Sequence, residues 1–489
     1  MINPTLTSCN TSGLEPYVPD GSNPWDESKA KHVFRRLAYG ASQNRLNLAL
    51  VLPPGQLIDN LVDAAYNMPP TSPPPWGYFS ISDFTDFETE NPEYIFDFRI
   101  QTGNEWVHQD MKGRMTFFWL NHFVTELEVY NYAPYLFQYF LVAETHALGN
   151  FKDFVRAIGL TPAMLLYLNG FENTHTEPNE NYARELFELF TLGEGNGYTQ
   201  EDIVETSKAL TGYNHWDEPG AAIYFDISTF VDENKTIFGQ TGNWDYDDVI
   251  DLLFQEKADL IALYICRKLY RFFVSPDVDA TIESNVIAPL AQTFINNSFE
   301  LVPVLKQLFK SEHFFDDRAL GVTIKSPFDL IFQYINETEF LYNDLLMEAF
   351  LYYAGTLGQI IFDPPDVSGW QRDQDWISTS TLTGRWELFK AYLSVLLDNG
   401  QTEAFRELAK NLSNDSIDPA YITQVIVDFL NAKPLFTTSD YDIATDIFKW
   451  EIPQNYYDEG LWNLDWEEAP FQVYLLLVHI ATMPEFQLK

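Results

Sequence analysis

The sequence is poor in cysteine, in basic residues and in long apolar runs, and each scarcity excludes a class of protein. Its 489 residues include only two cysteines, Cys9 and Cys266, and one possible bridge is no structural framework for a chain of this length. The 71 acidic residues outnumber 29 basic ones, and the formal charge of −42 would repel a phosphate backbone. We therefore expect no nucleic-acid partner.

The apolar runs are too short for a membrane helix. The run over 473–483, for example, falls well short of the roughly 20 residues that a bilayer requires, so we expect no membrane span. The first nine residues carry neither a basic n-region nor an apolar h-region, and no secretory signal is visible in them. An acidic surface suits solubility, and charge alone does not indicate a metal.

The chain is nevertheless rich in core-forming residues. Hydrophobic residues make up 46% of it and aromatic residues 16%, which is far from a disordered composition. Residues 1–27 are rich in Ser, Asn, Pro and Gly, and we expect an irregular N-terminal arm there. Residues 28–489 are expected to form a single large α-helical unit, with a possible subdivision near 213–245.

Apolar residues recur at helical spacing along most of the chain, and strict alternation of β-branched residues is nearly absent. This pattern predicts a mainly α fold with long ordered Pro- and Trp-rich loops and at most a short β-hairpin. Residues 80–100 lack clear periodicity, so we expect a loop or extended insertion there. The expected helices cover 29–39, 104–128, 132–147, 150–157, 161–168, 181–192, 200–211, 247–254, 257–273, 280–295, 300–309, 327–334, 339–354, 382–398, 402–410, 419–430, 440–448 and 468–482.

The segment 179–193 combines a helix start, an apolar face and a compact set of Asn, Arg and Glu side chains. Asn179 or Asn181 can cap the free amides of the first turn, and Gly193 can supply the left-handed residue that ends a helix. A helix over 181–192 follows from these signals.

That helix would carry a polar strip opposite its apolar face. Arg184, Glu185 and Glu188 lie on the strip. One interpretation is a solvated surface with an Arg184–Glu188 pair, which contributes only a few tenths of a kcal/mol. The other is a pocket wall on which Glu185 and Glu188 act as ligands or acid–base groups. Spacing alone favours the first interpretation.

Two histidines lie on expected helices near other polar groups. His122 and Glu126 have the i,i+4 spacing that lets two side chains hold one ion, and His146 follows Glu144 closely. A lone His in an aromatic helix is more often a hydrogen-bonded core residue. If a divalent metal ion is bound, a mixed set of nitrogen and oxygen ligands would suit zinc, iron or manganese. The candidate ligands are His122, His146, Glu185 and Glu188.

A Pro- and Trp-rich loop over 362–381 is the second distinctive block. Trp370 and Trp376 could stack against a sugar or close a pocket, because an indole offers a large apolar face and one donor. The alternative, which we favour, is that the loop is locked onto the core for structural reasons. The candidate substrate contacts are Asn121, Asn179, Asn181, Arg184, Trp370 and Trp376.

Several ordered blocks together resemble the bacterial domain of unknown function 1800 (DUF1800) family over nearly the whole chain. The resemblance implies no settled activity, but many members look exported and are encoded beside a sulfatase-like family, which implies work outside the cytoplasm. Family members often have His at the position of Phe190, and a His-Asp element near 230–235, where this chain has only Asp232. The matching blocks are 32–40, 119–123, 146–151, 162–167, 179–193, 198–213, 267–273, 358–381 and 484–487.

Two hypotheses follow. The first is a metal- or carboxylate-dependent hydrolase that acts on an extracytoplasmic polymer or ester, with Glu185, Glu188 and His122 as catalytic groups. The second is a non-catalytic protein that binds a protein or carbohydrate partner outside the cytoplasm, in which the Asn, Arg, Glu and His network fixes the helices. No phosphate loop, dinucleotide fingerprint, Gly-x-Ser-x-Gly turn or His-Glu-x-x-His helix supports another enzyme class.

Overall fold

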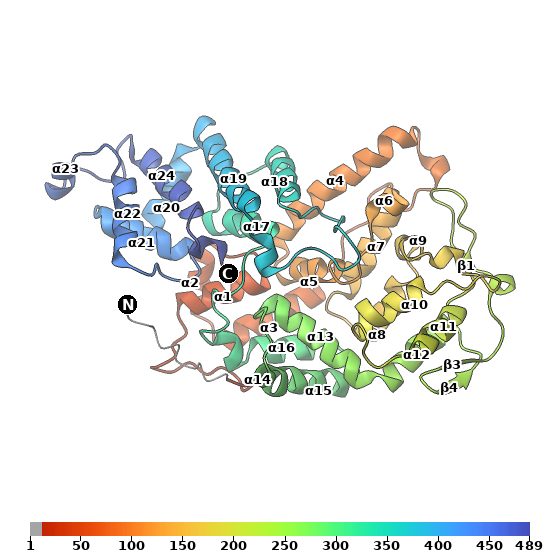
Figure 1. Cartoon of the computed structure of the whole chain (residues 1–489). Helices are drawn as coiled ribbons and strands as arrows, with labels where there is room; N and C mark the ends of the chain where they lie inside the picture. Colours follow the sequence, from red (N-terminus) through yellow and green to blue (C-terminus); the bar gives the residue numbers. More distant parts are fainter. Residues whose placement is uncertain (1–11) are drawn as a thin grey trace.

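The computed structural model describes residues 12–489, in which helices dominate and the strands form only two two-stranded sheets (Figure 1). The predicted mainly α fold is confirmed. Cys9 and the first part of the expected arm lie outside the described residues. The helices are α1 (Glu27–Leu37), α2 (Gln43–Leu50), α3 (Pro54–Asn67), α4 (Phe87–His108), α5 (Met111–Leu120), α6 (Leu127–Tyr130), α7 (Ala133–His146), α8 (Phe151–Ile158), α9 (Pro162–Tyr167), α10 (Asn181–Glu185), α11 (Gln200–Ala209), α12 (Tyr246–Glu256), α13 (Ala258–Phe273), α14 (Ala280–Ile282), α15 (Ala288–Asn296), α16 (Leu301–Phe309), α17 (Pro327–Thr338), α18 (Asp344–Thr356), α19 (Thr379–Asp398), α20 (Thr402–Ser413), α21 (Pro419–Leu430), α22 (Thr438–Lys449), α23 (Gln454–Asp458) and α24 (Ala469–Ala481).

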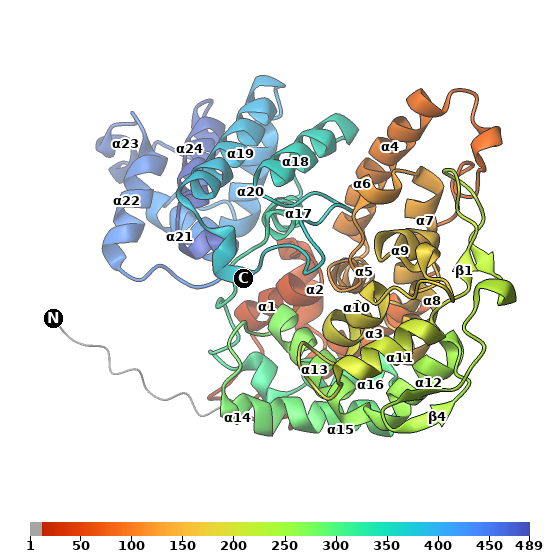
Figure 2. The same ribbon diagram turned by 45° about the vertical axis from the view of Figure 1, so that its right-hand side comes forward.

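The helices are arranged along one long axis of the molecule. The C-terminal helices α20 to α24 occupy one end, and α8 to α12 lie towards the other (Figure 1). The chain then returns to the middle, where its last residues lie close to α1 and α19 (Figure 2). A β-bridge between Ile324 and Leu488 joins this final segment to the stretch before α17. Within residues 12–489, no helix combines the length and hydropathy required to cross a bilayer.

The buried apolar side chains form one connected cluster that runs from Tyr17 to Phe486. Its largest members include Trp106, Trp119 and Trp462, which are almost fully buried. Aromatic residues therefore fill the core, as the composition indicates, because each ring buries a large apolar area. The predicted division into an arm over 1–27 and a unit over 28–489 stays a prediction.

The expectation of an irregular segment over 80–100 is wrong from residue 87 onwards, because α4 begins there and accommodates Pro92 inside its first turns. The expected single helix over 104–128 is wrong: α4 ends at His108, α5 covers Met111–Leu120, and residues 121–126, which include His122 and Glu126, are not helical. Asp110 adopts a φ of 48°, a left-handed backbone that separates α4 from α5. Tertiary burial of one face of α4 outweighs its weak periodicity.

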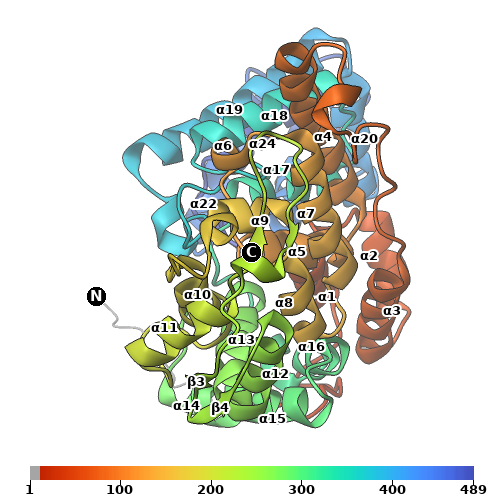
Figure 3. The same cartoon turned by 90° about the vertical axis from the view of Figure 1, so that its right-hand side faces the viewer.

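Two small hairpins occupy the region 213–245. Strand β1 (Tyr213–Asn214) pairs antiparallel with β2 (Tyr224–Phe225), and β3 (Lys235–Ile237) pairs with β4 (Gln240–Gly242). The end-on view brings α11 and the β3–β4 hairpin forward (Figure 3). The sequence Thr199 to Asp202 predicts a capped start for the expected helix over 200–211, and this prediction is confirmed, since the two residues form a reciprocal capping box at the start of α11.

Candidate functional site

The segment 179–193 forms the predicted helix and its predicted ends. The Asn179 side-chain oxygen accepts a hydrogen bond of 2.9 Å from the backbone N–H of Asn181, the first residue of α10. At the other end, Gly193 has a φ of 93°, which a residue with a Cβ rarely adopts. The local sequence signals therefore predict both ends of this element.

The second half of this helix is π-helical, over Leu186–Thr191. The Leu192 N–H donates to the carbonyl of Phe187, five residues earlier, at 2.8 Å. Such π-helical turns are rare and frequently occur at functional sites. At the end of this turn, side chains from other helices bind the carbonyl oxygens of Leu189 and Phe190.

His122 and Lys268 meet at the end of the π-helical turn. The His122 Nε2 lies 3.0 Å from the Phe190 carbonyl, which can only accept, so Nε2 carries the hydrogen. The other ring nitrogen, Nδ1, then accepts a hydrogen bond of 2.8 Å from the Lys268 ammonium. The Tyr264 hydroxyl donates to the Leu189 carbonyl at 2.8 Å. The backbone of the motif thus orients an amine–imidazole pair.

Burial sets the protonation of this pair. The His122 pKa lies well below its ordinary value because the ring is buried and because Lys268 is positive, so the ring is neutral. Burial, followed by the positive charge of Arg372, lowers the pKa of Lys268 to about 7. Near neutral pH the amine can therefore both release and accept a proton, which is the requirement for acid–base catalysis.

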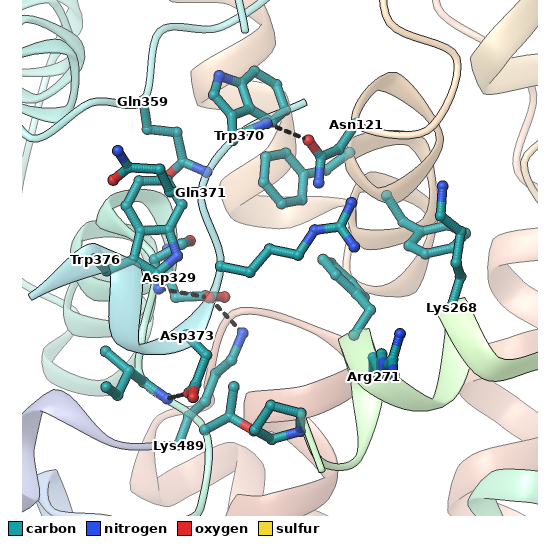
Figure 4. Close-up of a pocket in the computed structure, with 18 of the residues that line it drawn as sticks. Asn121, Lys268, Arg271, Asp329, Gln359, Trp370, Gln371, Asp373, Trp376 and Lys489 are labelled. Atoms are coloured by element: carbon teal, nitrogen blue, oxygen red, sulfur yellow. Dashed lines mark hydrogen bonds and ion pairs between the residues drawn. The ribbon is translucent and has the colours of Figure 1, made fainter. Parts of the chain in front are cut away.

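The pair lies on the wall of a central cavity of about 270 Å³. The end of α5, the face of α13, the start of α17 and the Pro- and Trp-rich loop surround this cavity (Figure 4). A second cavity of about 250 Å³, here called the side cavity, shares four lining residues with it. The shared residues are His122, Lys268, Arg271 and Arg372.

The Pro- and Trp-rich loop supplies the aromatic side of the central cavity. Trp370 is almost fully buried and stacks on Phe117, with ring centroids 5.1 Å apart and an interplanar angle of 10°. The Asn121 side-chain oxygen accepts the backbone N–H of Trp370 at 2.6 Å. A Cβ at Gly369 would approach that oxygen to 2.2 Å, so only glycine permits this contact. Trp376 is also buried and lines the cavity.

A buried ion cluster forms the base of the central cavity. It consists of Asp329, which accepts from both Arg114 and Lys489, with all three side chains almost fully buried. Burial alone would raise the pKa of Asp329, but the two positive partners lower it well below its usual range. Asp329 also accepts the Ser326 N–H at 3.0 Å, so this carboxylate holds α17 in place.

The protein family described as a protein of unknown function (DUF1800) matches residues 32–488. The chain belongs to this family. The resemblance found in the ordered sequence blocks is thereby confirmed. No curated protein and no solved structure matches the chain. Both cavities of this DUF1800 protein are lined by residues within the matched region, apart from Lys489.

The charged side chains of the 179–193 motif do not line either cavity. Arg184 pairs with Glu180 at 3.0 Å and with Glu188 at 3.2 Å, and all three side chains are partly solvent-exposed. Glu185 is half-buried and has no hydrogen-bond or ion-pair partner among residues 12–489. Burial, followed by the negative charge of Glu188, raises its pKa. This geometry favours the solvated-surface interpretation of the strip.

The remaining candidate ligands have other surroundings. His146 stacks on Phe154 at 5.5 Å, and its partial burial lowers its pKa. The Asn181 amide donates to Asn169 at 3.1 Å. Within residues 12–489 no group of three or more His, Cys, Asp or Glu side chains is arranged to hold a metal ion. The shared metal site of His122, His146, Glu185 and Glu188 stays a prediction, and the hydrogen bonds of His122 do not favour it.

Sequence reasoning missed Lys268, Arg271 and Arg372. Both blocks that contain them, 267–273 and 358–381, contribute to the DUF1800 resemblance, but the acid–base and metal-site patterns of the sequence consist of carboxylates and histidines. The available signal was compositional. Basic residues are scarce in this acidic chain. The close spacing of Arg267, Lys268 and Arg271 is therefore a signal that these residues belong to a functional site.

Proposed function

We propose that the central cavity is the active site of a hydrolase that cleaves an ester, and that Lys268, positioned by His122, carries the acid–base step. The observation behind the proposal is the 2.8 Å contact between the Lys268 Nζ and the His122 Nδ1 on the cavity wall. A metal ion is not part of this proposal. It retains the hydrolytic chemistry expected from the sequence and transfers the acid–base role from Glu185 and Glu188 to the amine–imidazole pair.

The proposed step uses the two protonation states of Lys268. The neutral amine takes a proton from a water molecule, and the water oxygen attacks the ester carbonyl carbon. When the C–O bond breaks, the resulting ammonium returns the proton to the leaving alkoxide. His122 accepts a hydrogen bond from the amine and is itself fixed by the Phe190 carbonyl, so it positions Lys268.

A second candidate function is binding without catalysis. The observation that favours it is that Arg184 pairs with Glu180 and Glu188 at the surface, away from both cavities, so the charged groups of the motif are not placed for catalysis. In that case the central cavity would bind a ligand without converting it chemically. A protein or carbohydrate partner outside the cytoplasm stays a prediction under both candidates.

The experiment is hydrolysis of a panel of chromogenic carboxylic esters by the full chain and by Lys268→Met and Lys268→Arg. We expect turnover by the parent protein that rises with pH through about 7, the pKa of Lys268. Both variants should lose at least tenfold in rate, because neither methionine nor arginine can take a proton near neutral pH. The exposed Lys390→Met on α19 is the matched control.

Equal rates for the parent protein and Lys268→Met would overturn the catalytic role. Absence of turnover with every ester, together with saturable ligand binding in the cavity, would support the second candidate instead. Circular dichroism of each variant establishes that the fold is retained.

A further inference from the structure

The cations shared by the two cavities form no ion pair with the carboxylates of the described chain, although Asp329 and Asp373 line the central cavity. Arg267 lines the side cavity but is neutralised by Glu283, at 2.5 Å and 3.1 Å. Lys268, Arg271 and Arg372, here called the basic wall, form no ion pair with a carboxylate anywhere in residues 12–489. Within that part of the chain, no Asp or Glu lines the side cavity at all. Three positive charges therefore face one space.

This arrangement contrasts with the rest of the chain. The protein carries 71 acidic residues against 29 basic ones, so three neighbouring cations without an ion-pair partner are unusual in this chain. Like charges in proximity repel one another, and the lowered pKa of Lys268 reflects the nearby Arg372 in addition to burial. An anion placed between these side chains would relieve the repulsion. Guanidinium groups suit such a ligand because they donate in a planar fork.

The central cavity offers further donors without acceptors. Trp370 and Gln359 line the cavity, and the buried indole N–H of the first and the amide nitrogen of the second have no hydrogen-bond partner among residues 12–489. The Gln359 oxygen is occupied by the Phe328 N–H at 2.9 Å. Buried polar groups are normally paired, so two unpaired donors point to a ligand that brings acceptors. Phe117 and Phe272 supply apolar surface beside them.

We infer that the basic wall binds the oxyanion group of a ligand, a phosphate, sulfate or carboxylate, while the apolar body of that ligand occupies the central cavity. Arg271 and Arg372 are exposed to solvent, so the anionic group can reach them from outside. Trp370 and Gln359 donate to acceptor atoms on the body. The inference rests on the proposed location of the active site, and it names the class of substrate that this site takes.

The test is isothermal titration calorimetry of the full chain with sodium phosphate, sodium sulfate and sodium acetate in turn, at pH 6.5 and constant ionic strength set with sodium chloride. We expect saturable binding of at least one anion. Arg372→Gln and Arg271→Gln should each weaken it at least tenfold. Lys390→Gln removes one positive charge from an exposed site outside both cavities and should leave the affinity unchanged.

The three titrations, with phosphate, sulfate and acetate, identify the anionic group of the ligand. Binding of phosphate or sulfate alone supports a tetrahedral oxyanion, and binding of acetate supports a carboxylate. No binding of any of the three anions, unchanged affinity in both arginine variants, or equal weakening by Lys390→Gln would overturn the inference. Hydrolysis is measured separately. Anion binding without ester turnover would overturn only the proposed catalysis. Ester turnover without anion binding would overturn only the inference that the basic wall binds an oxyanion.

Discussion

Two groups of positive side chains border the same central cavity and differ in their partners. In the buried ion cluster, Arg114 and Lys489 share the carboxylate of Asp329, and water has little access to any of them. In the basic wall, the same residue types have no carboxylate partner in the described chain and stand partly in solvent. The first group has a negative partner within the described chain, and the second has none.

The two groups contain the same residue types. What distinguishes the structural cations from the proposed ligand-binding cations is therefore whether a carboxylate partner is present. A buried charge without its partner is strongly destabilising, so the ion cluster has to be complete for the fold to form. A cation near solvent costs little when unpaired, so the basic wall can persist until an anion binds. Removal of one charge should therefore have opposite consequences in the two places.

The largest expected effect is on the ion cluster. Asp329→Asn leaves Arg114 and Lys489 buried without a negative partner, and we expect a loss of about 3–5 kcal/mol in the free energy of unfolding. Urea denaturation measures it. Asp398→Asn, at an exposed position at the end of α19, is the control and should change stability by about 0.5 kcal/mol or less. A loss below about 1 kcal/mol for Asp329→Asn would contradict the comparison.

The same prediction has a pH dependence. The Asp329 pKa is lowered in the folded protein, so its stabilising contribution is present above the ordinary Asp pKa of about 3.9 and is lost as pH falls towards the folded-state pKa. The difference between the parent protein and Asp329→Asn should therefore narrow below about pH 4. A constant difference between pH 7 and pH 3 would contradict the assignment.

The second effect concerns His122, which connects the 179–193 motif to Lys268 on the cavity wall. His122→Leu deprives the Phe190 carbonyl of its donor and Lys268 of its acceptor, and we expect a loss of about 1–3 kcal/mol in urea denaturation. His146→Leu, at the end of α7, removes a half-buried ring stacked on Phe154 and should lose less. If His146→Leu proves the more damaging substitution, the role assigned to His122 is wrong.

The third effect is on a pKa in the basic wall. Arg372→Gln removes a positive charge that lowers the pKa of Lys268, so that pKa should rise above about 7 while the free energy of unfolding changes by about 0.5 kcal/mol or less. Reductive ¹³C-methylation with NMR detection follows the Lys268 signal, and exposed Lys390 provides an internal reference. An unchanged or lower Lys268 pKa would contradict the charge repulsion.

The smallest effect is at Glu185. Its pKa is raised in the folded protein, so its contribution to stability falls as pH rises from the ordinary Glu pKa to the raised one. Glu185→Gln mimics the neutral form, and we expect a gain of up to about 0.5 kcal/mol at pH 7, with no gain below the ordinary Glu pKa. Thermal unfolding at both pH values measures it. Loss of ester turnover in this variant would support the catalytic role that the sequence analysis assigns to Glu185.

Local signals predicted several elements well because they depend on neighbouring residues alone. The capping box of Thr199 and Asp202 and the left-handed Gly193 follow from backbone chemistry within one turn. The start of α4 and the helices α2 and α3 were missed, since their stability comes from packing against distant segments. The π-helical turn was not predicted either, because the carbonyl oxygens at its end are bound by residues distant in sequence, His122 after α5 and Tyr264 on α13.

The sequence by itself determined the helical class, the family and the segment 179–193 as a distinctive helix, because composition, periodicity and ordered blocks are properties of the chain. Only the tertiary structure decided what that helix does. Its carbonyl groups orient His122 and its charged side chains face outwards, while Lys268 and Arg372 come from segments over 100 residues apart. Segments that are distant in sequence enclose the cavity. A local sequence pattern therefore cannot show whether a carboxylate lies near Lys268 and Arg372.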